Sequence, residues 1–296
     1  MTPLIDLQPE VKTKVKAALP KSLVDFISGC RYRGYLAHID YLLKIKKYRR
    51  LYSKANATTP DSAVVLPTGG CILVPPDIRD GFERFGWSYL DEVDEFISCM
   101  NVASNKKILW DVGAFFGLFS LAFALGGEGR RALAFEPNPV SRAKLEECLR
   151  LNPTAKVEVF GFPLGLRGEV TEFHRGPYYT AVAGLSVRPD EKDLTRMETV
   201  SIDELIEEKF DPPDMIKIDV EGLEFDVLQG ARELLLAKKP LLSIELHPSL
   251  LARRGASALA IAQYLEEAGY VLHNEQLGRV KQGFFKRGDN FRVFAM

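Results

Sequence analysis

The sequence predicts an α/β fold built on a mostly parallel β-sheet. Short apolar runs at residues 108–110, 131–135 and 156–160 alternate with segments 118–125 and 141–151, in which apolar residues recur at helical spacing. Strand and helix candidates that alternate in this way form βαβ units, whose strands lie parallel. An acidic residue, Asp111, follows the first run, and another, Glu136, follows the second. Ligands bind at this end of the strands in open α/β sheets.

The composition is that of an ordinary globular protein. The 296 residues are 46% hydrophobic and 27% charged, with a formal net charge of -1, so no overall basic charge points to a nucleic-acid partner. The four cysteines lie far apart in the sequence and none forms a C-x-x-C pair, which argues against a disulfide framework and a zinc site. The sequence shows no signal-peptide pattern and no apolar run of about 18 residues. We therefore expect a soluble, cytoplasmic protein.

Residues 1–60 differ from the rest, because twelve Lys and Arg residues stand there against four Asp and Glu. Apolar residues recur at helical spacing near Leu23 and again near Leu36, so we predict a basic helical N-terminal extension. We favour a helical cap with a solvated basic face. Peripheral contact with a membrane surface or another anionic partner is the alternative.

Two further regions follow this extension. Residues 61–100 are predicted to form a β-hairpin and a helix that lead into the core, and residues 101–296 to form the main α/β domain. A second hairpin is predicted within the main domain. The paired strands of the two hairpins are 63–66 with 71–74, and 169–174 with 185–188.

The central motif is Asp111-Val-Gly-Ala-Phe-Phe-Gly117, a D-x-G-x-x-x-G pattern between a strand and a helix. Glycines in such a turn let the backbone approach a ligand, and the helix start offers free N–H groups. The dinucleotide fingerprint G-x-G-x-x-G is absent, because Phe115 and Leu118 stand where it has glycines. We interpret the motif as a cradle for the methionine end of S-adenosyl-L-methionine (SAM). A close-packed turn without a ligand is the alternative.

Glu136 lies 25 residues after Asp111, at the end of the second predicted strand. An acidic residue near this position accepts hydrogen bonds from the ribose in nucleotide-binding α/β folds. A carboxylate suits this role, because it offers two oxygens to two hydroxyl donors. A solvent-exposed glutamate before a turn is the alternative.

A second polar cluster follows the predicted strand 215–218. Asp219 and Glu221 come directly after this strand, and the next predicted strand ends in Glu245 and His247. Strand alternation places Glu245 and His247 on the same side of the chain. These four side chains have the chemistry of metal ligands, but their spacing matches no specific metal site, so we predict no metal.

Four segments together resemble the FkbM family of SAM-dependent methyltransferases over about residues 90–295. The resemblance implies a Rossmann-like, seven-stranded, mostly parallel sheet with helices on both faces and the strand order 3-2-1-4-5-7-6. The sequence departs from the family at Phe115-Phe116, where Asn-Ile or a similar pair is common, and two aromatic rings there would narrow the pocket. The four segments are Asp111–Gly117, Phe135–Pro139, Ile216–Gly222 and Ile244–His247.

The resemblance also implies which residues contact SAM. Asp111, Gly113 and Gly117 would surround the methionine moiety, Glu136 would hold the ribose, and Asp219 would face the methyl-donor pocket. The full set of expected cofactor-binding residues is Asp111, Gly113, Ala114, Phe115, Gly117, Glu136, Pro137 and Asp219.

The expected reaction is O-methylation, because family members mostly methylate hydroxyl groups on sugars, polyketides and other secondary metabolites. A small-molecule or glycan acceptor is therefore expected. Its hydroxyl must lose a proton, and His247 is the expected general base because its unperturbed pKa lies near neutrality. Glu221 and Glu245 are alternative bases, or they orient the histidine and the substrate.

Several other functions remain open. They are N-methylation, binding of SAM or a nucleotide without catalysis, and a membrane-associated scaffold led by the N-terminal helices. The incomplete dinucleotide fingerprint weighs against a dehydrogenase. The acceptor and the oligomeric state do not follow from the sequence.

Overall fold

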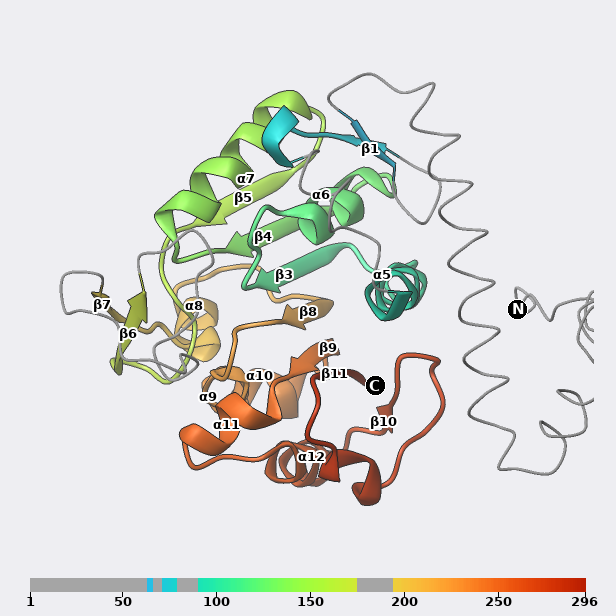
Figure 1. Ribbon diagram of the computed structural model, residues 1–296, viewed down its shortest axis with the longest axis vertical. Coiled ribbons are helices and arrows are strands. Elements are labelled where there is room, and N and C mark those ends of the chain that lie inside the picture. The colour runs from blue at the N-terminus through green and yellow to red at the C-terminus, as the bar shows by residue number, and fades with distance from the viewer. Residues whose placement is uncertain (1–62, 66–70, 79–89, 175–193) are drawn as a thin grey trace, which may run out of the picture. The chain divides into compact units, whose positions relative to one another are not determined.

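A seven-stranded β-sheet runs through the protein in the order β10-β11-β9-β8-β3-β4-β5 (Figure 1). The computed structural model describes residues 63–65, 71–78, 90–174 and 194–296, all of which belong to one compact unit, Asn56–Met296. The predicted basic extension, residues 1–60, lies outside the described residues. No helix in the described ranges has the length and apolar character needed to cross a membrane.

The topology confirms the predicted strand order. Numbering the seven strands along the chain turns the observed order into 6-7-5-4-1-2-3, which is 3-2-1-4-5-7-6 read from the other edge. The strands are parallel except β11, which pairs antiparallel with both of its neighbours. Their bounds are β3 (Ile108–Val112), β4 (Arg131–Phe135), β5 (Val157–Phe160), β8 (Met215–Ile218), β9 (Leu241–Leu246), β10 (Leu272–His273) and β11 (Phe291–Ala295).

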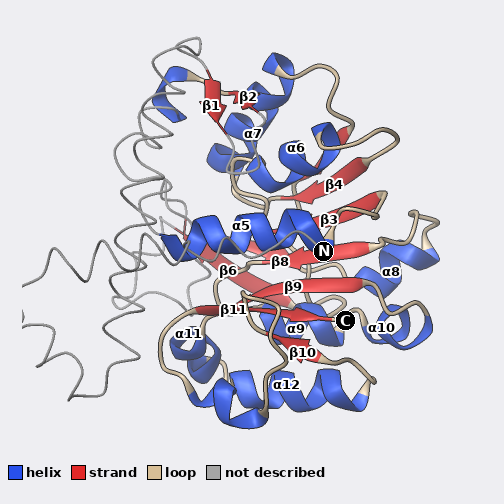
Figure 2. Cartoon of the chain, turned by 90° about the vertical axis from the view of Figure 1, so that its right-hand side faces the viewer, coloured by secondary structure: helices blue, strands red, loops and turns tan. Residues whose placement is uncertain are grey.

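Helices cover both faces of the sheet, as predicted. Alternate strand residues point to opposite faces, so Leu109 packs in one apolar cluster with helices α5 and α6, and Trp110 in another with helices α8 to α12. Figure 2 shows α5 lying across the first face. The helices on this face are α5 (Leu90–Val102), α6 (Leu118–Leu125) and α7 (Pro139–Leu151). Those that contribute to the other cluster are α8 (Ile202–Glu207), α9 (Glu224–Gln229), α10 (Arg232–Ala237), α11 (Pro248–Arg253) and α12 (Ala258–Glu267).

Local sequence signals explain where several helices begin. Asn138 caps α7, because its side chain accepts a hydrogen bond from the N–H of Val140 at 2.8 Å, and Pro139 follows at the first helical position. Ser201 and Glu204 form a capping box at the start of α8. These helix starts fix the loops that follow β4 and β7 (Leu194–Glu198).

Two hairpins lie outside the main sheet. The first, β1 (Ala63–Val65) with β2 (Cys71–Leu73), confirms the prediction. In the second, β6 (Val170–His174) pairs with β7 (Leu194–Glu198), a strand that was not predicted. The predicted strand at 185–188 lies outside the described residues. The sequence of β7, Leu-Thr-Arg-Met-Glu, is too polar to predict a strand from its apolar pattern.

Candidate functional site

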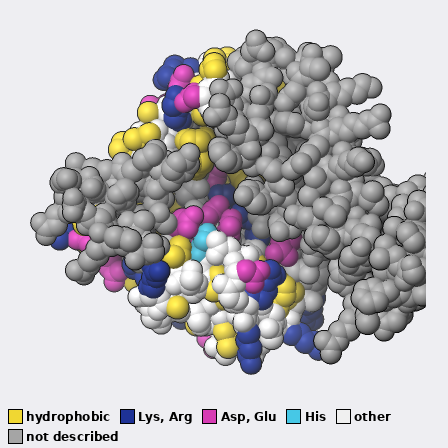
Figure 3. All heavy atoms as spheres, in the orientation of Figure 1, with side chains coloured by type: hydrophobic (Ala, Val, Ile, Leu, Met, Phe, Trp, Pro, Cys, Tyr) yellow, Lys and Arg dark blue, Asp and Glu magenta, His cyan; other side chains and the backbone are white. Residues whose placement is uncertain are grey.

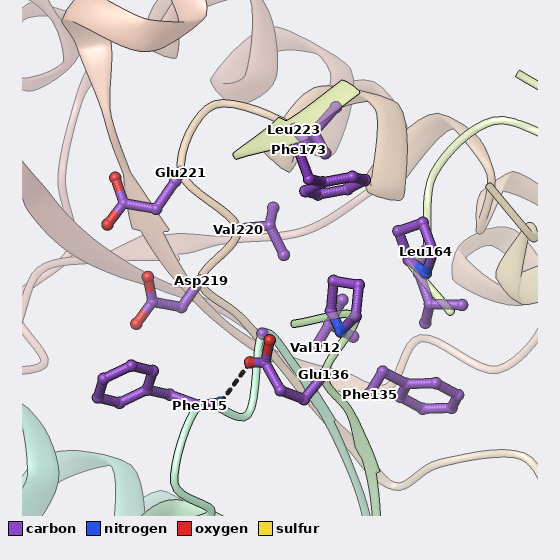
Figure 4. Close-up of a pocket in the computed structure, with 13 residues that line it drawn as sticks. Val112, Phe115, Phe135, Glu136, Leu164, Phe173, Asp219, Val220, Glu221 and Leu223 are labelled. Carbon is purple, nitrogen blue, oxygen red and sulfur yellow. Dashed lines mark hydrogen bonds between the residues drawn. The ribbon is translucent and has the colours of Figure 1, made fainter. Parts of the chain in front are cut away.

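A cavity of about 330 Å³ opens at the carboxyl ends of β3, β4 and β8 (Figure 4). Residues that directly follow these three strands line it: Gly113 after β3, Glu136 after β4 and Asp219 after β8. The volume is at the lower end of the range for small-molecule sites. The cavity therefore lies where ligands bind in open α/β sheets.

Gly113 brings the ends of β3 and β8 into direct contact. Its φ of +77° is in the left-handed region, and a Cβ atom there would lie 1.9 Å from the carbonyl oxygen of Asp219. Gly117 has the same φ, and a Cβ atom there would lie 2.7 Å from Cγ of Leu145. Both positions need glycine, the first to shape the cavity wall and the second to pack the start of α6 against α7.

Glu136 is buried and faces the cavity. Its Oε2 accepts a hydrogen bond from the N–H of Phe115 at 2.7 Å, drawn as a dashed line in Figure 4, and its Oε1 accepts one from the N–H of Asn138 at 2.9 Å. Burial raises the pKa of Glu136, and the two backbone hydrogen bonds only partly offset that rise. Each oxygen keeps acceptor capacity beyond its backbone donor. The side chain is thus fixed in place and retains capacity for two further donors.

The rest of the cavity wall is largely apolar, and the sequence analysis did not identify it. Leu164 follows β5, Phe173 belongs to the β6 hairpin, and Val220 and Leu223 come from the loop before α9. Such side chains form the slots in which flat, apolar ring systems bind. Their apolar character is common to the whole core, so it gave no signal of a binding role.

Five of the eight residues expected to bind the cofactor line the cavity: Gly113, Phe115, Glu136, Pro137 and Asp219. Among them, Phe115 has a φ of +52° and is 40% exposed. Its ring stacks on Phe116 with 3.7 Å between centroids. Phe116 does not line the cavity, so only one of the two aromatic rings can narrow it.

The other three expected residues do not line the cavity; they are Asp111, Ala114 and Gly117. Asp111 is fully buried, and its Oδ2 accepts a hydrogen bond from Oγ of Ser120 at 2.7 Å. This bond ties the end of β3 to α6. Direct contact of these three residues with a cofactor stays a prediction.

A charged cluster adjoins the cavity, and the three expected catalytic residues lie within it. Nε2 of His247 is 3.6 Å from Oε2 of Glu221 and 3.8 Å from Oε1 of Glu245. Of the three, only Glu221 also lines the cavity. Figure 3 shows acidic side chains gathered beside a histidine in a hollow on the viewed face. The structure therefore brings the three residues together, although their catalytic roles stay predictions.

His247 is held by a residue to which the sequence analysis gave no role. Its Nδ1 lies 2.6 Å from Oε1 of Glu224, a fully buried carboxylate. Burial alone would lower the pKa of His247, but Glu224, Asp219 and Glu221 outweigh it and raise that pKa to about 9. At neutral pH the ring is therefore mostly cationic, in contrast to the unperturbed value assumed from the sequence.

Two buried cations neutralise part of the acidic cluster. Nζ of Lys217 lies 3.3 Å from Asp111 and 3.5 Å from Asp219, and Nη2 of Arg292 lies 2.5 Å from Glu245. Burial would raise the pKa of Asp219, but Lys217 and Arg292 lower it to about 2. Asp219 is therefore ionised at the edge of the cavity. Arg292 comes from β11, and no sequence motif indicated its role.

Asp219, Glu245 and His247 have the chemistry of metal ligands, with one ligand atom of each within 4.8 Å of the others. Carboxylate oxygens and an imidazole nitrogen suit several divalent cations. However, Arg292 and Lys217 already supply positive charge to these carboxylates. The absence of a metal stays a prediction.

Two curated proteins match part of this chain in sequence. The chain is 31% identical over 140 residues to the hexuronic acid methyltransferase AglP of Haloferax volcanii, which covers 47% of this chain and 56% of AglP. It is 28% identical over 207 residues to the AMB antimetabolite synthetase AmbE of Pseudomonas aeruginosa, covering 57% of this chain and 10% of AmbE. The chain thus spans only part of each relative.

One similar solved structure is the methyltransferase FkbM from Methylobacillus flagellatus KT, which is 21% identical to this chain. The match covers 64% of this chain and 43% of that chain, with a TM-score of 0.43. The family model of the methyltransferase FkbM domain matches residues 111–272, which is more than half of the chain. The matched segment runs from the end of β3 to β10 and contains the residues that line the cavity and those of the charged cluster except Arg292. The chain therefore belongs to the FkbM methyltransferase family.

Proposed function

We propose that this protein transfers a methyl group from SAM to a hydroxyl group of a sugar-like small molecule or a glycan. The observation that carries the proposal is Glu136, which two backbone hydrogen bonds hold in a buried position facing the cavity. A carboxylate held in this way can accept hydrogen bonds from both hydroxyls of a ribose. Membership of a methyltransferase family makes SAM the expected ribose-containing ligand.

The residues present fit the chemistry of SAM. Glu136 would hold the ribose, Leu164 and Phe173 would contact the adenine, and the Gly113 turn would admit the methionine part. Asp219, ionised at the cavity edge, would attract the positive charges of the cofactor. When bound, SAM supplies an electrophilic methyl group on a sulfonium.

The acceptor hydroxyl must lose its proton as its oxygen is methylated, so a base within hydrogen-bond reach is needed. We assign His247 as this base. Its Nε2 points toward Glu221 and Glu245 at distances too long for hydrogen bonds, so it is not committed to either carboxylate. Glu221 is the alternative base, because it lines the cavity directly.

The side chains of the cluster also support a polyhydroxylated acceptor. Glu221 and Glu245 are partly exposed carboxylates that can accept hydrogen bonds from sugar hydroxyls. The relative AglP is named for action on a hexuronic acid. A sugar acid or a related glycoside is therefore the first acceptor to test.

The cofactor site can be tested by isothermal titration calorimetry with SAM and S-adenosylhomocysteine. Wild type should bind both, and Glu136→Ala should bind at least about tenfold more weakly, since two charge-assisted hydrogen bonds are lost. Glu128→Ala, at an exposed loop position, is the matched control and should bind like wild type. No binding by wild type would refute the proposal.

Acceptors can then be screened with isotopically labelled SAM. Methylation of a hydroxylated sugar would support O-methyl transfer, and the product's mass spectrum and NMR spectrum would identify the methylated atom. Methylation only of amines would instead favour N-methyl transfer, because an amine needs less help from a base. Tight cofactor binding without transfer to any acceptor class would favour a non-catalytic role.

A further inference from the structure

Glu224 is a fully buried carboxylate at the start of α9. Its Oε1 accepts a hydrogen bond from the N–H of Gly222 at 2.9 Å and lies 2.6 Å from Nδ1 of His247. Its Oε2 is also buried and has no hydrogen-bond partner in the described part of the chain. Burying a carboxylate is costly unless it is paired. His247 is the partner that pairs with this carboxylate, and it belongs to the cluster where the acceptor is proposed to bind.

The contact with Glu224 determines which way the imidazole faces. Because Nδ1 is directed at Glu224, Nε2 is directed to the opposite side of the ring, toward Glu221 and Glu245 at 3.6 Å and 3.8 Å. A hydrogen bond from Nδ1 to Glu224 also fixes the tautomer of the neutral ring, with the lone pair on Nε2. That nitrogen is therefore the one available to take a proton.

The other carboxylates near His247 are less suited to this role. Glu221 is 43% exposed, and Glu245 is already paired with Arg292 at 2.5 Å. Asp219 interacts with Lys217 and Arg292. Glu224 alone among these four carboxylates is within hydrogen-bond distance of the ring.

We propose that Glu224 is a positioning residue that holds His247 with Nδ1–H toward Glu224 and Nε2 toward the acceptor, and that stabilises the imidazolium formed during the reaction. This inference rests on the proposed function, in which His247 is the base. In the step, the acceptor oxygen gives its proton to Nε2 and bonds to the methyl carbon as the carbon–sulfur bond breaks and its electron pair stays on sulfur. The proton then leaves His247 for solvent.

The electrostatic surroundings agree with this role. The charged groups that raise the pKa of His247 are Glu224, Asp219 and Glu221, and the hydrogen bond to Glu224 is the largest of these contributions. Removing only the charge of Glu224 should therefore lower the pKa of His247 more than removing any other single charge in the cluster.

NMR of histidine-labelled protein tests the inference without cofactor or acceptor. The chain has four histidines, and the signals of His247 are those lost in His247→Asn. In wild type, His247 should titrate near pH 9, with its neutral form carrying the proton on Nδ1. In Glu224→Gln the pKa should fall by at least about one unit. Glu266→Gln, an exposed position on α12, is the matched control and should change nothing.

Turnover supplies the second measurement. At pH 10, above the pKa of His247 in both proteins, Glu224→Gln should lower kcat by about tenfold or more, with the KM for SAM nearly unchanged. Glu224→Asp keeps the charge and should recover part of the loss. It also serves as the test variant if Glu224→Gln does not fold, since a shortened carboxylate should weaken the preference for the Nδ1–H tautomer.

The two measurements separate the possible failures. If the pKa and tautomer of His247 are the same in Glu224→Gln as in wild type, the positioning role is wrong, whatever the activity. If the His247 titration moves but turnover and its pH profile do not, Glu224 holds the ring but His247 is not the base, and the proposed mechanism fails. A shift in both supports the inference.

Discussion

The backbone at Gly113 passes so close to Asp219 that a Cβ atom on residue 113 would lie 1.9 Å from the carbonyl oxygen of Asp219. No side chain fits between the ends of β3 and β8. The approach sets the carboxylate of Asp219 at the edge of the cavity, on the same side as the cluster that contains His247. The packing of these two strands is therefore sufficient to require the glycine of the central motif.

Gly113→Ala should therefore lose both stability and cofactor binding. The methyl group would meet backbone, which cannot move aside cheaply, and the left-handed φ adds strain, so we expect a loss of about 3 kcal/mol or more. Gly129→Ala is the matched control, because Gly129 has a φ of +72° and only Nζ of Lys107 nearby, at 3.8 Å. It should cost about 1 kcal/mol. Urea unfolding measures the loss of stability in each variant, and equal losses in the two would contradict the steric argument.

Turnover should depend on pH in a way that identifies the base. If His247 accepts the proton, kcat should rise about tenfold per pH unit above neutrality and level off near pH 9, the pKa of His247. Initial rates between pH 6 and pH 10 at saturating substrate measure this. A profile already flat at pH 7 would exclude His247 and favour Glu221, since a carboxylate titrates at lower pH even though burial raises the pKa of Glu221.

Arg292→Met should destabilise the protein strongly. Arg292 is 2% exposed, and its removal would leave Glu245 without its buried cation and Asp219 with Lys217 alone. Removing one partner of a buried ion pair typically costs about 3–5 kcal/mol. Arg232→Met is the matched control, because the ion pair of Arg232 with Glu233 is exposed and should contribute less than about 1 kcal/mol. Chemical unfolding at neutral pH compares the two. Similar losses in both variants would show that Arg292 has little electrostatic importance.

Stability should also fall at alkaline pH. The pKa of His247 is raised in the folded state from 6.5 to about 9, so its contribution is fully present below pH 6.5 and is lost as the pH rises through 9. The shift corresponds to about 3 kcal/mol. Urea unfolding at pH 6.5 and pH 9.5 should show this loss in wild type and a much smaller one in His247→Asn. A loss of equal size in both proteins would assign it to other groups.

The part of the fold that the sequence predicts correctly is the part with strong periodicity. The apolar run at 131–135 is β4, and the helical spacing of 118–125 is α6 with the same bounds. The strand β7 was missed because three of its five residues, Leu-Thr-Arg-Met-Glu, are polar and because it lies in a hairpin outside the main sheet. The sequence does predict its partner β6, but β7 itself could be recognised only from the pairing.

The residues of the site also divide into those that the sequence predicts and those that it does not. Gly113, Glu136 and Asp219 could be predicted because each directly follows a recognisable strand. Glu224 and Arg292 could not, because they depend on contacts between residues distant in the sequence. Glu224 meets His247 across 23 residues, and Arg292 meets Glu245 across 47. Only the register of β11 against β9 places Arg292 opposite Glu245.

The position of β11 bears on how the protein is made. Among the described strands, β11 is the last to be translated, yet it lies between β9 and β10. Until residues 291–295 leave the ribosome, the nascent chain presents β9, whose sequence is Leu-Leu-Ser-Ile-Glu-Leu, as an open and largely apolar edge. Such edges bind chaperones or other growing chains. The charge balance around Glu245 is likewise completed only when Arg292 arrives, so the cluster forms after synthesis of the rest of the sheet.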